Sequence, residues 1–134
     1  MPRPQAQLHQ KYHMKTTYQT GFMGELYAAQ WLEEHAGMEL LRNRYRCKAG
    51  EIDLIMRDRN TIVFVEVKTR THATAGNGLM AVDRRKQQRI ARAAVLYLME
   101  NKSLKMPVRF DAVEVSSSGV IHIPNAFQPG SMFY

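Results

Sequence analysis

Two short runs of apolar and β-branched residues, joined by a few polar residues, constrain the fold of this chain more than any other feature. The first run spans residues 50–56 and the second spans 62–68, with Asp58-Arg59-Asn60-Thr61 between them. A two-residue loop of Arg59 and Asn60 would join the runs as an antiparallel hairpin with Asp58 opposite Thr61. The sequence therefore predicts a β-hairpin and fixes which residues of its two strands face one another.

The predicted register brings charged residues together at the end of the hairpin far from its loop. Asp53 is then opposite Glu66, and Glu51 is opposite Lys68. Because directly opposed residues point to the same side of a sheet, we expect Asp53, Glu66 and Lys68 to share one face. The other face is predicted to be core, made by Ile52, Leu54, Met56, Val63, Val65 and Val67.

The two opposed carboxylates indicate a metal site. They repel each other and are costly to bury unless a cation or a proton compensates them. Mg²⁺ and Mn²⁺ prefer hard oxygen ligands, and bound Mg²⁺ is often completed by waters and substrate phosphates. A phosphodiester is the expected substrate, and the Lys68 ammonium could orient or activate water or stabilise transition-state charge. A surface salt bridge between Glu66 and Lys68 is the simpler alternative.

The remaining sequence predicts an α/β fold with a simple order of elements. Apolar residues at helical spacing predict a first helix over residues 18–36, stopped by Gly37. Alternating or β-branched segments predict strands at 38–46, 51–57, 61–70, 108–116 and 120–123. A second helix is predicted over 79–101, with Asp83 as an alternative N-cap. Residues 1–16 are predicted to form an N-terminal arm and residues 17–134 a single domain.

The charge balance of the chain favours a polyanionic partner. Its 134 residues include 19 Lys and Arg against 12 Asp and Glu, for a net charge of +7. Such an excess favours nucleic acid, because binding releases condensed counterions. No apolar run approaches the roughly 20 residues that span a bilayer, and the N-terminus is too polar for a secretory signal. With Cys47 as the single cysteine, we expect a cytoplasmic protein that does not bind membranes.

Cationic residues on the second predicted helix could contact a phosphate backbone. Arg85, Arg89 and Arg92 recur at helical spacing and would form one stripe, which could equally be a solvated face. Lys86 lies on a different row of the helix and either extends to solvent or points toward the charged end of the hairpin. Arg70 follows Lys68 on the same strand alternation and would extend a positive rim.

A second pair of charges interrupts the predicted strand 108–116. Arg109 and Asp111 are two residues apart and would lie on the same face of that strand. Opposite charges at this spacing are typical of a structural ion pair. We therefore assign them to the scaffold and not to the chemistry.

The motifs of the hairpin and its flanking helices resemble those of a known superfamily of nucleases. Asp53 followed by Glu66-Val67-Lys68 on the next strand, with a helix before and after, resembles the PD-(D/E)XK nucleases, which have the restriction-endonuclease-like fold. Within them the chain resembles the uncharacterised bacterial YraN-like family. That resemblance covers about residues 15–127 and rests on Gly21-x-x-Gly24-Glu25, Arg42-Asn43, Gly50-Glu51-Ile52-Asp53-Leu54-Ile55, Val63-Phe64-Val65-Glu66-Val67-Lys68-Thr69-Arg70, Lys86, Arg109-Phe110-Asp111 and Asn125-Ala126-Phe127.

This resemblance implies both a fold and an active site. The fold would be an αβββαβ core in which a mixed central sheet is flanked by helices. The chain is also similar, more distantly, to archaeal-type Holliday junction resolvases, in which a glutamate of the first helix joins the metal site. Glu25 matches that place. The resemblance thus implies Glu25, Asp53, Glu66 and Lys68 as catalytic residues, the three carboxylates as metal ligands, and Mg²⁺ or Mn²⁺ as the cofactor.

The sequence leads to one main functional hypothesis and two alternatives. We expect a metal-dependent endonuclease that hydrolyses phosphodiester bonds in structured or branched DNA. A homodimer would suit paired cuts in a symmetric junction. The alternative from another class is a non-catalytic nucleic-acid-binding or scaffold module on the same fold. An RNA nuclease is the third interpretation, since no residue can be identified that reads the 2′-hydroxyl.

Overall fold

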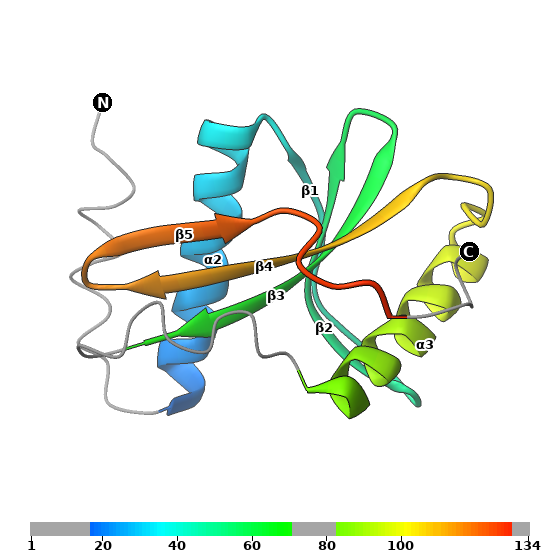
Figure 1. The fold of residues 1–134 in the computed structure, drawn as a ribbon, viewed down its shortest axis with the longest axis horizontal. Helices are drawn as coiled ribbons and strands as arrows, with labels where there is room; N and C mark the ends of the chain where they lie inside the picture. The colour runs from blue at the N-terminus through cyan, green and yellow to red at the C-terminus, as the bar shows by residue number, and fades with distance from the viewer. Residues whose placement is uncertain (1–16, 71–82, 130–134) are drawn as a thin grey trace.

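The computed structural model describes residues 17–70 and 83–129 of the chain, and its elements follow the predicted order (Figure 1). The first helix is α2 (Thr17–Ala36), and α3 (Arg84–Glu100) follows three strands. The strands are β1 (Glu39–Cys47), β2 (Gly50–Asp58), β3 (Thr61–Thr69), β4 (Val108–Ser116) and β5 (Gly119–Ile123). The predicted αβββαβ core is therefore confirmed, with β5 as an added edge strand.

The five strands form a single mixed sheet in the order β1-β2-β3-β4-β5. Neighbouring strands are antiparallel except β3 and β4, which are parallel. Parallel neighbours need a long crossover connection, and the segment that contains α3 provides it. This crossover brings the first turn of α3 back beside the sheet after β3 has ended.

The two helices cover opposite faces of the sheet (Figure 1). Helix α2 packs through Tyr27, Ala28 and Leu32 on a cluster that includes Leu54 and Val65. Helix α3 packs on the other face, through a second cluster made by Ile90, Ala93, Tyr97, Leu98, Ile55, Phe64 and Phe110. Strand β3 contributes to both clusters, and its sequence is correspondingly a nearly continuous hydrophobic run from Ile62 to Val65.

The hairpin has the predicted register near its loop, where Asp58 pairs with Thr61 and Leu54 pairs with Val65. The paired ladder stops at Leu54 and Val65. Residues 50–52 of β2 continue to pair with β1 but not with β3. The predicted ladder pairings of Asp53 with Glu66 and of Glu51 with Lys68 are therefore wrong. Glu51 forms an ion pair with Arg46 instead.

Where β2 and β3 separate, one predicted core residue lies on the other face of the sheet from the one expected. Ile52 was expected beside Leu54 and Met56, but it packs in the cluster under α3. A bulge in β1 between Leu40 and Arg42 increases the local twist of the β1–β2 hairpin. At residues 50–52 the β1–β2 hairpin lies beside α3. In this part of β2, strict alternation no longer predicts which face of the sheet a residue occupies.

The ends of the helices follow the predicted signals. Gly37 adopts a left-handed φ of 67°, which ends α2 where a residue with a side chain would be strained. Asp83 is the N-cap of α3 and accepts a hydrogen bond of 2.7 Å from the Arg85 N–H. The predicted start of this helix at residues 79–82, and the predicted arm at residues 1–16, lie outside the described residues. None of the helices in the described part is long and apolar enough to cross a membrane.

Candidate active site

Asp53 and Glu66 lie side by side at the point where β2 and β3 separate. The Asp53 Oδ2 accepts a hydrogen bond of 2.8 Å from the Val67 N–H, which replaces a bond of the interrupted ladder. The two carboxyl groups are close enough to hydrogen-bond to each other when one is protonated. Burial and the adjacent Glu66 charge raise the Asp53 pKa well above its usual value. The structure therefore brings together the carboxylates that the register predicted as neighbours.

Glu25 reaches this region from α2 and is almost fully buried. Its Oε1 accepts hydrogen bonds from Arg44 Nε at 2.8 Å and from Asn43 Nδ2 at 3.1 Å. The same Asn43 amide also donates to the Asp53 carbonyl at 3.3 Å, so it ties Glu25 to the strand of Asp53. Burial raises the Glu25 pKa, while the bonds from Arg44 and Asn43 act in the opposite direction. Glu25 is within electrostatic range of Asp53 but is held by protein donors.

The cation that pairs with Glu66 is Lys86 from the first turn of α3, not Lys68. The Lys86 ammonium contacts Glu66 Oε2, and the Glu66 side chain is only 4% exposed. Of the two predicted orientations of Lys86, the structure shows the one toward the charged end of the hairpin. The simpler alternative of a bridge between Glu66 and Lys68 is not what the structure shows.

Lys68 lies two residues after Glu66 on β3 and is half-buried. Its partner in the parallel ladder is Glu114 of β4, which is fully buried. Arg70 forms an ion pair with that same carboxylate at 3.3 Å, and its N–H donates to the Val115 carbonyl. Arg70 was predicted to extend a positive rim, yet at least part of its charge compensates a buried glutamate.

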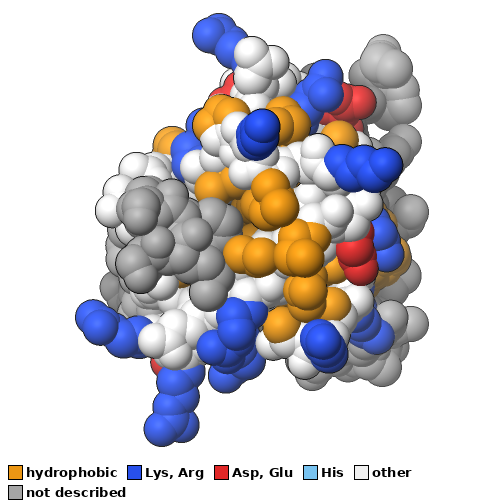
Figure 2. Space-filling model, turned by 90° about the vertical axis from the view of Figure 1, so that its right-hand side faces the viewer, with side chains coloured by type: hydrophobic (Ala, Val, Ile, Leu, Met, Phe, Trp, Pro, Cys, Tyr) orange, Lys and Arg blue, Asp and Glu red, His pale blue; other side chains and the backbone are white. Residues whose placement is uncertain are grey.

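The predicted stripe on α3 is exposed at all three positions, Arg85, Arg89 and Arg92. The base of Arg89 is near the tip of the β1–β2 hairpin, because a Cβ on Gly50 would lie 3.5 Å from the Arg89 Cβ. Figure 2 shows the side of the molecule on which α3 lies, where Lys and Arg side chains surround a band of apolar side chains. Exposed apolar residues at the end of α3 and in the following segment include Met99 and Leu104.

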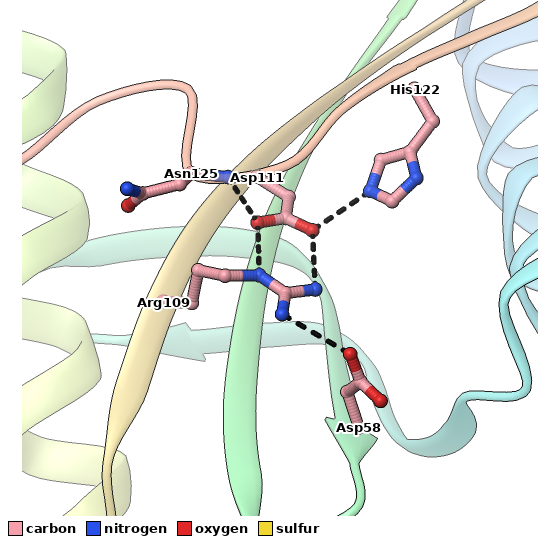
Figure 3. Close-up of polar contacts among 5 residues, drawn as sticks. All are labelled: Asp58, Arg109, Asp111, His122 and Asn125. Atoms are coloured by element: carbon pink, nitrogen blue, oxygen red, sulfur yellow. Dashed lines mark hydrogen bonds and ion pairs between the residues drawn. The ribbon is translucent and has the colours of Figure 1, made fainter.

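The predicted pair of Arg109 and Asp111 is confirmed as part of a larger network (Figure 3). Arg109 binds the Asp111 carboxylate with two bonds, of 2.9 and 3.0 Å, and reaches Asp58 at 3.1 Å. His122 Nε2 and the Asn125 N–H contact the Asp111 oxygens at 2.8 Å. Burial alone would raise the Asp111 pKa, but these bonds outweigh burial and lower it. Figure 3 shows that both carboxylate oxygens of Asp111 are bonded, which is consistent with a scaffold role.

The donor set near Asp53 fits a small hard cation bound by two carboxylates. Among residues 17–70 and 83–129, no three His, Cys, Asp or Glu side chains are arranged to hold a metal ion. The structural reason is that Arg44 holds Glu25 and Lys86 holds Glu66. Asp53 and Glu66 nevertheless remain adjacent, and one or two carboxylates suffice for Mg²⁺ when substrate phosphates complete its shell. A site in which Glu25 is a third ligand stays a prediction.

Three residues of this region were missed by sequence reasoning. Asn43 stood in a family motif without a role, and nothing in the pattern distinguished Arg44 from other basic residues. Glu114 offered a usable signal, because it interrupts the apolar run Ala112-Val113-Glu114-Val115 as Glu66 interrupts its own strand. Charged residues are almost never fully buried without a partner, so a charge within a strand that is apolar on both sides indicates a buried ion pair.

Residues 24–115 match the model of a protein family described as "Uncharacterised protein family UPF0102". The chain belongs to this family. It is 43% identical over 112 residues to a UPF0102 protein of Geobacter metallireducens, covering 81% of this chain and 91% of that protein. It is 44% identical over 110 residues to a UPF0102 protein of Saccharophagus degradans, covering 81% and 92%. The predicted membership of the YraN-like bacterial family is thereby confirmed.

Proposed function

We propose that this protein is a Mg²⁺- or Mn²⁺-dependent endonuclease that hydrolyses phosphodiester bonds in structured or branched DNA. The observation that supports it most is the adjacent pair Asp53 and Glu66, held at the point where two strands separate and faced by the Lys86 ammonium. Paired buried carboxylates beside cations are costly for a fold, so they are more informative about chemistry than a solvated charge is. The resemblance to PD-(D/E)XK nucleases supports the same proposal.

In this proposal, Asp53 and Glu66 hold the metal ion, and Glu25 is the third proposed ligand. Arg44 and Asn43 both bond Glu25 through Oε1, so they can fix this side chain while it presents Oε2. The Val67 N–H fixes the Asp53 carboxylate in the same way. When bound, the ion would polarise the phosphate and lower the pKa of the attacking water.

The cations of the site would act on the substrate. Lys68 orients or activates the attacking water, or stabilises the charge that develops on the phosphate. Arg85, Arg89 and Arg92 of α3 would contact the phosphate backbone without reading bases, together with Arg70 and Lys86. Cys47 is a free thiol, which suits a reducing compartment such as the cytoplasm. The proposed DNA substrate is consistent with the same location.

The alternative is a binding or scaffold module that no longer cleaves nucleic acid. The observation in its favour is that Arg44 and Lys86 already neutralise two of the three carboxylates. Such a module would bind DNA with a strong dependence on salt and would be indifferent to replacement of Asp53.

A cleavage assay separates these functions. Wild type, Glu66→Gln and Glu51→Gln would be incubated with labelled linear, flapped and four-way DNA, and with RNA of the same shapes, in Mg²⁺, Mn²⁺ or EDTA. Glu51 is the matched control, because it is an exposed acid of the same hairpin, paired with Arg46. We expect metal-dependent cutting of branched DNA that survives Glu51→Gln and is lost in Glu66→Gln. If Glu66→Gln cut branched DNA as fast as wild type, the proposal would be contradicted. If wild type cut RNA but not DNA, the protein would be an RNA nuclease.

A further inference from the structure

The ion pair between Lys86 and Glu66 joins two side chains of very different accessibility. The Glu66 side chain is 4% exposed, whereas the Lys86 side chain is 37% exposed. Lys86 thus approaches the carboxylate from solvent, at the third residue of α3. Because its ammonium is partly in solvent, Lys86 can move away from the Glu66 carboxylate without unfolding of the site.

The cation that pairs with Glu25 is fixed much more firmly than Lys86. Arg44 is 15% exposed and stacks on the ring of Phe22 while it bonds Glu25 at 2.8 Å. Its planar guanidinium suits a permanent, directional contact, whereas a lysine ammonium is a point charge on a flexible stem. Of the two cations, Lys86 is therefore the one whose position can change.

The charges of the site give Lys86 a reason to move. Asp53, Glu66 and Glu25 interact electrostatically, and Asp53 is compensated in part by the backbone N–H of Val67. A divalent cation shared by Asp53 and Glu66 would compete with Lys86 for the same Glu66 oxygens, since two cations on one carboxylate repel each other. Displaced from Glu66, the ammonium would remain on α3, next to the exposed Arg85 and Arg89 that a phosphate backbone would meet.

We propose that Lys86 is an exchangeable counter-ion of the site, which holds Glu66 until a divalent cation replaces it and then binds a phosphate of the nucleic acid. This inference rests on the proposed function, and it adds a coupling between metal and substrate. Metal binding releases the ammonium for the phosphate, and the phosphate in turn keeps the ammonium from returning to Glu66. Each ligand therefore favours the other, because such coupling is reciprocal.

The exchange makes a prediction that a static salt bridge does not. Removing the ammonium should tighten metal binding and weaken nucleic-acid binding at the same time. If Lys86 served only to hold α3 against the sheet, its loss would lower stability and leave the metal affinity unchanged or weaker.

The test measures Mn²⁺ affinity by calorimetry and the affinity for a four-way DNA by fluorescence anisotropy. The proteins are wild type, Lys86→Met, Lys86→Arg and Lys105→Met. Lys105 is exposed beyond the far end of α3 and controls for the loss of one positive charge. With DNA absent, we expect Lys86→Met to bind Mn²⁺ roughly tenfold more tightly, corresponding to about 1.4 kcal/mol. With Mn²⁺ present, we expect it to bind DNA several-fold more weakly. Lys86→Arg should bind Mn²⁺ several-fold more weakly than wild type, because a guanidinium holds Glu66 more firmly than an ammonium does. Lys105→Met should stay within about twofold of wild type.

The outcomes separate this inference from the function on which it rests. Unchanged or weaker Mn²⁺ affinity in Lys86→Met, in a protein whose wild type binds Mn²⁺, would overturn the exchange and leave the proposed metal site standing. Tighter metal binding with unaltered DNA affinity would overturn the second step. Absence of Mn²⁺ binding from all four proteins would overturn both the exchange and the proposed nuclease.

Discussion

At the scale of single residues, the structure shows two acids whose surroundings shift their pKa values in opposite directions. Asp111 is fully buried, whereas Asp53 is half-buried. Asp111 has a bonded partner for each oxygen and a lowered pKa. Asp53 has one backbone donor, a neighbouring carboxylate and a raised pKa. A site optimised only for stability would not place Asp53 next to Glu66, so the contrast indicates which acid serves the scaffold and which serves function.

Replacing Asp53 should make the protein more stable in the absence of divalent ions. Because its pKa is raised in the folded protein, the folded state loses stability as pH rises from the usual value of 3.8 through the higher folded pKa. At pH 7 the variant Asp53→Asn keeps the acceptor for the Val67 N–H and removes one negative charge. We expect a gain of about 1 kcal/mol in the free energy of unfolding by urea denaturation.

The control for that measurement is Glu51→Gln, which removes an exposed charge of the same strand. It should change the free energy of unfolding by less than about 0.5 kcal/mol. A loss of stability in Asp53→Asn would mean that the carboxylate is compensated in the folded state, contrary to its raised pKa.

For Asp111 we expect the opposite effect on the free energy of unfolding: its replacement should destabilise the protein. Its pKa is lowered by the bonds from His122, Arg109 and Asn125, so it contributes stability above the usual value of 3.8, and that stability is lost as pH falls through the lower folded pKa. Asp111→Asn should cost about 3 kcal/mol at pH 7, because Arg109 is left without its buried partner. Thermal unfolding at pH 7, 5 and 3 should show a difference from wild type that is constant at the first two values and smaller at the third. A difference that grows on acidification would refute this account.

At the scale of elements, the hairpin and α3 together make the candidate site. The pairing of β2 with β3 was predictable, because a two-residue loop and a period of two fix the register near the turn. The end of that ladder at Leu54 and Val65 was not predictable, since beyond it β2 pairs only with β1, and no local pattern of the hairpin encodes this. Asp53 and Glu66 became neighbours as expected, while Ile52 and Glu51 beyond them did not follow the register.

For α3, too, local features could be predicted from the sequence, but its long-range contacts could not. Its helical spacing and the Asp83 cap are local signals, and both appear in the sequence. The contact between Lys86 and Glu66 depends on how the crossover from β3 to β4 seats the helix, which no local pattern encodes. Sequence alone could therefore give two orientations for Lys86 but not choose between them.

The exposed face of α3 predicts a salt dependence of DNA binding. Each cation that neutralises a phosphate contributes about 0.9 to the slope of log K against log salt concentration. Replacing Arg85, Arg89 and Arg92 by Gln should lower that slope by about 2 to 3. The matched control is a triple variant in which three exposed cations elsewhere, Arg57, Lys102 and Lys105, are replaced by Gln. It has the same change in net charge. If both triple variants reduce the slope equally, the protein has no preferred DNA-binding face and α3 is a solvated surface.

At the scale of the whole molecule, the sheet has one helix on each face and the candidate site lies where the strands of the hairpin diverge (Figure 1). The apolar core on both sides holds this arrangement, and the charged residues of the site occupy the end of that core. The fold was predictable because its order of elements is simple. The function requires the site to be tested directly, since a fold hosts many activities.

The homodimer expected from the sequence stays a prediction. If a second copy of the chain covered the band of apolar side chains in Figure 2, that surface would be removed from water. Sedimentation equilibrium over a hundredfold range of concentration should show a species of twice the 15.5 kDa chain mass. A single species of the chain mass at every concentration would exclude the dimer.

The central claim is that Asp53 and Glu66 together bind a divalent cation, and Mn²⁺ titration by calorimetry tests it most directly. Wild type, Asp53→Ala and Glu51→Gln would be titrated alone and in complex with a four-way DNA. The account predicts one Mn²⁺ site in wild type and Glu51→Gln, strengthened by DNA, and its loss in Asp53→Ala. Binding of equal strength in Asp53→Ala, or no binding to wild type even with DNA, would contradict the account.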